Sequence, residues 1–100
     1  MSSLTIHRRG RNDIVVCGDL TFAGIDKKTV SALPLAKSGS RITVDLGQVT
    51  AVDSAGLALL IEWLKLARNR QFQLLFKHMP EQLLELAEAN GFADLLRQSQ

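Results

Sequence analysis

The sequence predicts an α/β domain in which a four-stranded mixed β-sheet is flanked by three to four helices. Three observations predict this fold class. The 100 residues have room for one domain, residues 1–100. Short runs of β-branched residues alternate with helix-like segments in the order β-β-α-β-α-β-α. The strand–helix–strand unit at residues 41–78 is typical of a right-handed crossover that joins parallel strands.

The first half of the chain begins with a predicted hairpin. Residues 3–7 and 13–18 are short strand-like runs, and the intervening RRGRN has the composition of a turn. Residues 22–33 then predict a first helix, with Thr21 as its N-cap. Pro34 and the KSGS stretch after it are expected to end that helix in a loop.

The second half of the chain alternates strands and helices. Ile42, Val44 and Leu46 alternate with polar neighbours, which predicts a strand with one buried face at 41–46. The longest helical pattern runs from Asp53 to about Arg70. The remaining predicted elements are a strand at 71–78, a helix at 79–92 with Pro80 at its first position and Asn90-Gly91 as its stop, and one helical turn at 93–98.

The composition indicates an ordinary soluble domain, with 46% hydrophobic and 22% charged residues and a formal net charge of +2. Lys and Arg are scattered along the sequence, and HRRGR at 7–11 is interpreted as a solvated turn, so no nucleic-acid partner is expected. The N-terminus lacks the apolar core of a signal peptide, and no apolar run approaches the roughly 18 residues that span a bilayer. We therefore expect a cytoplasmic protein without direct membrane insertion.

The residues that carry chemistry point away from catalysis. His7 and His78 have no Cys, Asp or Glu at ligand spacing, so neither a metal nor a cofactor is expected. The DSAG at 53–56 does not match the G-x-S-x-G nucleophile motif, and no phosphate-binding loop is present. No catalytic residue is predicted, and the chain is expected not to be an enzyme.

Asp53 and Ser54 lie where a strand gives way to a helix, in the stretch TAVDSAGLALL. Either side chain could accept hydrogen bonds from the free N–H groups of the helix, as an N-cap does. Ser54 could also be a phosphoacceptor or a partner contact, since a phosphate at a helix start adds nearly two negative charges that a partner would sense. The two interpretations are compatible.

The helix after Ser54 has apolar residues on more than one side. Leu57, Leu60, Ile61, Leu64 and Ala67 share one face at 100° per residue, and this face is predicted to pack on the sheet. Leu59 and Leu66 fall on roughly the opposite side, and Trp63 lies at the border. We interpret these three as an outward docking surface, although isolated exposed leucines are also normal.

These segments resemble the STAS domain family, named for sulfate transporters and anti-sigma factor antagonists. The resemblance rests on CGDLTF, on VDLGQVTAVDSAGL and on the final LLELAEANGF, and it covers nearly the whole chain. It implies a small mixed sheet flanked by helices, with no catalytic activity of its own.

Two branches of that family are compatible with the sequence. DSAGLALLIEWLKLAR looks closer to the MlaB-type STAS subunit, which implies a non-enzymatic cytoplasmic protein that binds and regulates the ATPase of the Mla phospholipid ABC transporter. That transporter maintains outer-membrane lipid asymmetry, and the subunit is peripheral to the inner membrane through the ATPase and its permease. The resemblance to anti-sigma factor antagonists implies instead that an anti-sigma factor kinase phosphorylates Ser54.

The partner-binding surface expected from geometry and resemblance comprises Asp53, Ser54, Ala55, Leu59, Trp63 and Leu66. Ala55 lies where antagonists often have a second Ser, and this departure neither supports nor excludes phosphorylation. A module that binds a small ligand is a third interpretation, for which no pocket residue is specified.

Overall fold

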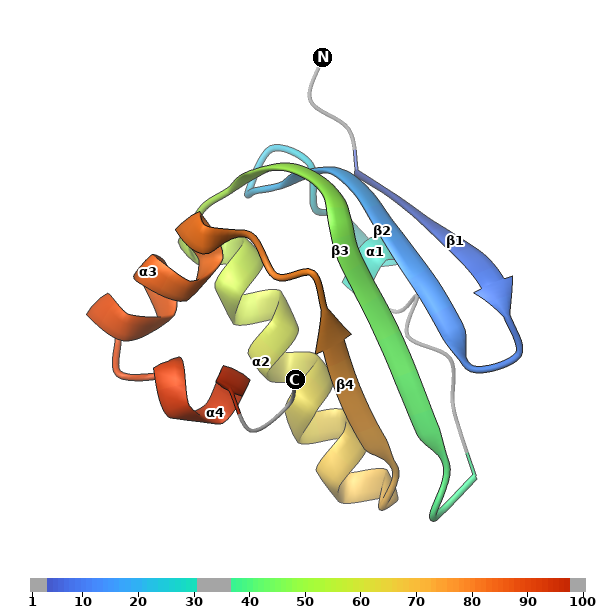
Figure 1. Ribbon diagram of the computed structural model, residues 1–100. Helices are drawn as coiled ribbons and strands as arrows, with labels where there is room; N and C mark the ends of the chain where they lie inside the picture. Colours follow the sequence, from blue (N-terminus) through green and yellow to red (C-terminus); the bar gives the residue numbers. More distant parts are fainter. Residues whose placement is uncertain (1–3, 31–36, 98–100) are drawn as a thin grey trace.

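The computed structural model describes residues 4–30 and 37–97, which build one four-stranded sheet (Figure 1). The strands are β1 (Leu4–Gly10), β2 (Asp13–Leu20), β3 (Arg41–Val52) and β4 (Gln73–Lys77), and they lie side by side in that order. β1 and β2 form the predicted antiparallel hairpin, whereas β2, β3 and β4 are parallel to one another. The predicted mixed sheet is therefore confirmed.

In the described ranges, four helices accompany the sheet: α1 (Lys27–Val30), α2 (Ser54–Arg70), α3 (Glu81–Ala89) and α4 (Ala93–Arg97). The helices predicted at 53–70, 79–92 and 93–98 are confirmed within a few residues. Pro80 is the N-cap of α3, one position before the helix begins, and the chain leaves α3 at Asn90. The fold class is the predicted one.

The first predicted helix is wrong over its first half. Residues 22–24 form a turn and residues 25 and 26 have no regular structure; the Thr21 carbonyl accepts hydrogen bonds from the N–H groups of Gly24 and Ile25. The helix begins only at Lys27, because Asp26 supplies the capping oxygen that accepts from the Thr29 N–H at 2.8 Å. Residues 31–36, which include Pro34, lie outside the described part of the chain.

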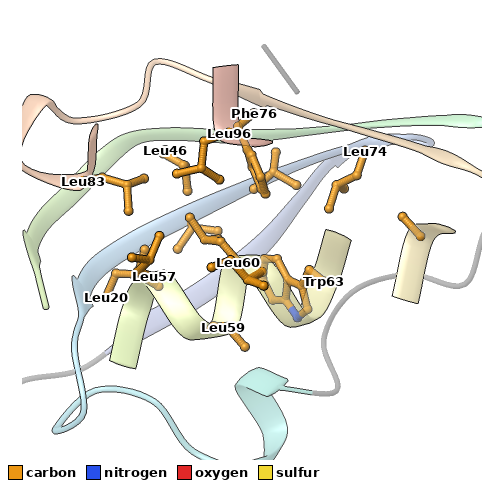
Figure 2. Close-up of a cluster of buried hydrophobic side chains, with 14 of the residues drawn as sticks. Leu20, Leu46, Leu57, Leu59, Leu60, Trp63, Leu74, Phe76, Leu83 and Leu96 are labelled. Carbon is orange, nitrogen blue, oxygen red and sulfur yellow. The ribbon is translucent and has the colours of Figure 1, made fainter. Parts of the chain in front are cut away.

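The hydrophobic core lies between the sheet and helices α2, α3 and α4 (Figure 2). The strands supply the alternating residues on one face of the sheet, as predicted for Ile42, Val44 and Leu46. The fully buried side chains of the core include Ile14, Val16, Leu20, Leu60, Leu83 and Leu96.

The prediction that Leu59 and Trp63 face outward is wrong. Only 4% of Leu59 and 1% of Trp63 is exposed, and Leu66 is half-buried against the same core. Helix α1 lies near the side of α2 that carries Leu59 (Figure 2), and α1 itself contacts β1 of the sheet. Leu59, Trp63 and Leu66 therefore pack in or against the core, which the helical pattern of the sequence does not show.

Candidate partner-binding site

Asp53 ties the start of α2 to the turn after β2. Its Oδ1 accepts hydrogen bonds from the N–H groups of Ala55 at 2.9 Å and Gly56 at 3.2 Å, and its Oδ2 accepts from the Phe22 N–H at 3.0 Å. The hydrogen bond from Phe22 is the largest influence that lowers the pKa of Asp53. This one carboxylate therefore caps the helix and holds Phe22 beside it.

Gly56 is required by close packing at the same point. A Cβ at this position would collide with the carbonyl oxygen of Leu20, the last residue of β2, and no side-chain movement could relieve that contact. The start of α2 can therefore lie directly against the end of β2 only with glycine here. The glycine of the DSAG motif has this structural role.

Ser54 is the first residue of α2 and its side chain is exposed. Within the described ranges its hydroxyl forms no hydrogen bond, because Asp53 fulfils the capping role. Of the two interpretations of the Asp53-Ser54 pair, capping belongs to Asp53. The hydroxyl of Ser54 is left accessible from solvent.

An exposed strip of α2 continues from Ser54 through Ala58 and Glu62, with a hollow on each side. The hollow on one side measures about 320 Å³ and is bordered by Phe22, and the other measures about 250 Å³ and is bordered by Phe92. Phe22 is 82% exposed and Phe92 is 38% exposed, and they are the two large exposed hydrophobic residues of the described chain. We call this region the Ser54 surface; it comprises Phe22, Ser54, Ala55, Ala58, Glu62 and Phe92.

Two of the six predicted site residues, Ser54 and Ala55, lie on this surface, and a third, Asp53, is next to it. Asp53 and Ala55 adjoin Ser54, whereas Leu59, Trp63 and Leu66 lie in or against the core. Sequence reasoning missed Phe22 and Phe92, because Phe22 lies in a turn and Phe92 directly follows one, where no periodic pattern distinguishes an exposed aromatic from a buried one. The signal that could have found Phe22 is its place in the LTF element, two residues after the end of β2.

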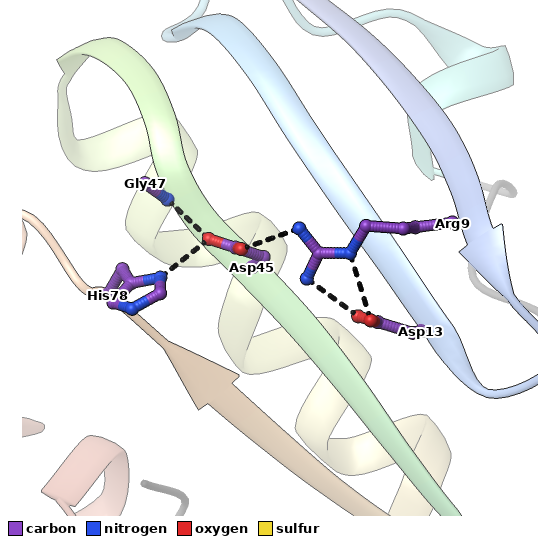
Figure 3. A network of polar contacts seen from close by, with 5 residues as sticks. All are labelled: Arg9, Asp13, Asp45, Gly47 and His78. Carbon is purple, nitrogen blue, oxygen red and sulfur yellow. Dashed lines mark hydrogen bonds and ion pairs between the residues drawn. The ribbon is translucent and has the colours of Figure 1, made fainter.

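A polar network on the opposite face of the sheet sets the path of β3 (Figure 3). Asp45 accepts hydrogen bonds from the Gly47 N–H at 2.8 Å, lies 3.1 Å from the Nδ1 of His78 and pairs with Arg9 at 3.0 Å. These contacts, with Gly47 first, lower the pKa of Asp45 to about 2. The register between β2 and β3 shifts around Gly47 and resumes at Gln48, and a second shift follows between Val49 and Ala51 before the pairing ends at Val52. The strand therefore runs six residues further than predicted and delivers Asp53 to the site.

No three His, Cys, Asp or Glu side chains come together as metal ligands in the part of the chain that is described. His78 has Asp45 as its acidic neighbour, and His7 lies on another strand, β1. None of the described helices is long and apolar enough to cross a membrane. The Ser54 surface thus exposes one hydroxyl among small and aromatic residues.

Comparison with known proteins shows the family of the chain. The family model described as "Mlab, STAS domain" matches residues 7–97. Proteins named anti-sigma-B factor antagonist from Listeria monocytogenes and Listeria innocua are each 31% identical over 85 residues, which is 84% of this chain and 75% of theirs. A Bacillus subtilis protein of the same name is 24% identical over 91 residues, 89% of this chain and 84% of its own length. The chain belongs to the STAS domain family.

Proposed function

We propose that this STAS domain is a regulatory subunit that binds the ATPase of an Mla-type phospholipid ABC transporter through the Ser54 surface. It acts by binding and not by catalysis, in the cytoplasm, and reaches the inner membrane through the ATPase and its permease. The match to the MlaB-type family description supports the choice of partner.

The observation that carries the proposal is the exposure of Phe22, 82%, beside the free hydroxyl of Ser54. The backbone of Phe22 is fixed by Asp53 at 3.0 Å, so the aromatic ring extends from an ordered point. Exposed aromatic residues next to hollows are typical of interface centres, where one or two such anchors contribute most of the affinity. The partner is expected to place apolar side chains in the two hollows beside Ala58 and to hydrogen-bond Ser54.

Binding at this surface gives a physical route to regulation. A subunit that contacts the assembled ATPase more favourably than the separate ATPase subunits stabilises the assembled state by its difference in binding free energy. We therefore expect the STAS subunit to raise ATP hydrolysis by promoting the assembled, hydrolysis-competent dimer.

The test is co-purification with the Mla-type ATPase of the same organism, together with its rate of ATP hydrolysis. Ala58→Asp places a charge between the two hollows and should weaken binding by at least tenfold, since an unpaired charge buried in an interface is costly. Ala89→Asp is the matched control, because Ala89 is an exposed alanine of another helix, α3. Equal binding of both folded variants would contradict the proposed surface.

The alternative is an anti-sigma factor antagonist controlled by phosphorylation of Ser54. The names of the relatives favour it, and so does the exposed, unbonded hydroxyl at the first position of α2. A phosphate there would extend from the helix start into the Ser54 surface and would oppose an apolar partner. The same surface could thus be switched off by one modification.

The alternative has its own test with a kinase-like anti-sigma factor from the same organism. Ser54→Asp should abolish binding to that factor, and Ser54→Ala should bind constitutively and resist phosphorylation. Mass spectrometry after incubation with ATP would show whether one phosphoryl group is added at Ser54. Capture of the ATPase with an unmodified Ser54 would instead support the transporter role.

A further inference from the structure

The end of the molecule farthest from Ser54 gathers the positive charge that the sequence scatters. Helix α2 has 17 residues and so spans about 25 Å at 1.5 Å per residue, from Ser54 to Arg70. β3 runs in the opposite direction, so its first residue, Arg41, lies near the end of α2 (Figure 1). The β1–β2 turn lies at the same end.

Hydrogen bonds fix these segments against one another. The Asn12 carbonyl in the hairpin turn accepts from the Thr43 N–H at 2.8 Å, which joins the turn to β3. The Gly39 N–H donates to the Gln71 carbonyl at 2.7 Å, and Arg41 Nε donates to Gln73 Oε1 at 3.2 Å. The hairpin turn, the loop before β3 and the end of α2 therefore form one continuous surface.

Six exposed cationic side chains lie on these segments, and we call the region the cationic end: Arg8, Arg11, Lys37, Arg41, Arg68 and Arg70. None of the six takes part in an ion pair within the described residues. The two acids nearest the hairpin, Asp13 and Asp45, are both paired with Arg9, which is not counted among the six. The charge of the cationic end is thus uncompensated.

We propose that the cationic end binds the surface of an anionic phospholipid bilayer, with the Ser54 surface facing away from the membrane. Clusters of four to eight Lys or Arg side chains are the usual signature of such binding, and each contributes about 1 kcal/mol near an anionic surface. This binding needs neither insertion of the chain nor an apolar patch. It goes beyond the proposed function and does not depend on it.

Other anionic partners fit this region less well. A stable protein interface has an apolar centre, but the large exposed hydrophobic residues of the described chain, Phe22 and Phe92, both lie on the Ser54 surface. Single-stranded nucleic acid requires exposed aromatic side chains for base stacking, which are likewise missing from the described cationic end. The β1–β2 hairpin at this end is a two-stranded ribbon of the kind that enters a groove of duplex DNA, so binding to duplex DNA is one outcome of the test below. A flat bilayer surface requires only charge density.

The experiment measures sedimentation of the purified full chain with vesicles of phosphatidylcholine alone or mixed with phosphatidylglycerol. Binding is expected only to the mixed vesicles, and it should weaken as salt is added. Arg11→Gln/Arg70→Gln should reduce binding about thirtyfold. This expectation follows from removing two cations at about 1 kcal/mol of binding free energy each, because about 1.4 kcal/mol corresponds to a tenfold change in affinity. Arg11→Lys/Arg70→Lys should retain most of the binding, since the charge remains.

The matched control is Lys27→Gln/Lys77→Gln, which also lowers the formal net charge from +2 to 0 but leaves the cationic end intact. Lys27 and Lys77 are exposed and lie on α1 and at the end of β4. Binding of this variant should stay within about threefold of the parent. Equal loss in both neutral variants, no binding to anionic vesicles, or tighter binding to duplex DNA at the same salt would each overturn the proposal. None of these outcomes would bear on the ATPase test.

Discussion

The two ends of α2 present different chemistry to solvent although one helix connects them. At its start, Asp53 caps the helix and the surrounding surface is formed by small and aromatic residues. At its last turn, Arg68 and Arg70 join the cations of the hairpin and of the loop before β3. Acids at the start of a helix and bases at its end are favoured by the helix dipole, so local rules explain the sign of the charge at each end.

Local rules do not explain the exposed aromatic residues at the first end. Phe22 is 82% exposed, whereas an aromatic side chain normally gains free energy by burial. The helix dipole therefore accounts in part for the charges at the two ends of α2, but it does not account for the exposed apolar area beside Ser54. Four predictions test this separation, beginning with the largest expected effect.

Trp63 lies between the two ends of α2, and its truncation should destabilise the whole domain and not one end alone. Trp63→Ala removes a large side chain that is 1% exposed, so we expect a loss of about 3–5 kcal/mol in the free energy of unfolding. Urea denaturation followed by circular dichroism measures this loss. Phe22→Ala is the control and should change stability by less than about 0.5 kcal/mol. A stable Trp63→Ala variant that fails to bind the ATPase would restore Trp63 as a contact residue.

A methyl group added at the start of α2 should destabilise the domain, whereas one added near the cationic end should be tolerated. Gly56→Ala forces a Cβ against the Leu20 carbonyl and should cost up to about 3 kcal/mol, because backbone cannot move aside as a side chain does. Gly10→Ala, in the strand beside the cationic end, places its Cβ 3.7 Å from the Cβ of Asp13, an ordinary contact, and should be tolerated. Trp63 fluorescence during denaturation compares the two. Equal stability of both variants would contradict the close approach of α2 to β2.

Acid should weaken the contacts of Asp45 with Gly47 in β3, the strand that leads to the Ser54 surface. The pKa of Asp45 is about 2 in the folded protein, below its ordinary value of about 3.9, so its ionised form stabilises the fold. This contribution, roughly 2 kcal/mol, is present above pH about 4 and is lost as the pH falls through about 2. Asp45→Asn should therefore lower the urea midpoint at neutral pH, and its difference from the parent should shrink in acid.

The control for this titration is Asp94→Asn, because the side chain of Asp94 is 94% exposed and its closest cation is 3.9 Å away. Its urea midpoint at neutral pH should stay close to that of the parent, because the removed carboxylate is exposed to solvent. A constant difference between Asp45→Asn and the parent from neutral pH down to pH about 2 would mean that the charge of Asp45 contributes nothing to stability.

The smallest effect on stability is expected from one added acid at each end. Ser54→Asp places a carboxylate at the start of α2, where the helix dipole favours it by about 0.3–1 kcal/mol, partly offset by repulsion from Asp53. It should weaken binding to the partner of the Ser54 surface and leave vesicle binding unchanged. Ser38→Asp, near the end of α2, should do the reverse. If Ser54→Asp weakened vesicle binding and Ser38→Asp weakened binding to the partner, the two ends would have the opposite functions.

Much of the architecture follows from patterns that the sequence shows directly. Alternation at Ile42, Val44 and Leu46 fixes which face of β3 is buried, and the DSAG motif fixes where α2 begins. The helix from 22 failed because Thr21 and Asp26 are both good capping residues, and a choice between them depends on the turns that follow β2. Within the site, Asp53, Ser54 and Ala55 were predicted because a strand–helix junction is a local feature.

The sequence by itself determined the fold class, the order of the elements and the strand–helix junction at Asp53-Ser54. Only the tertiary structure decided that Leu59 and Trp63 are buried, that Phe22 and Phe92 flank Ser54, and that scattered cations meet at one end. The reason is the range of the interactions involved. Capping and alternation act over a few residues of sequence, whereas burial of a second helix face and the gathering of charge depend on segments that are distant in the chain and adjacent only after folding.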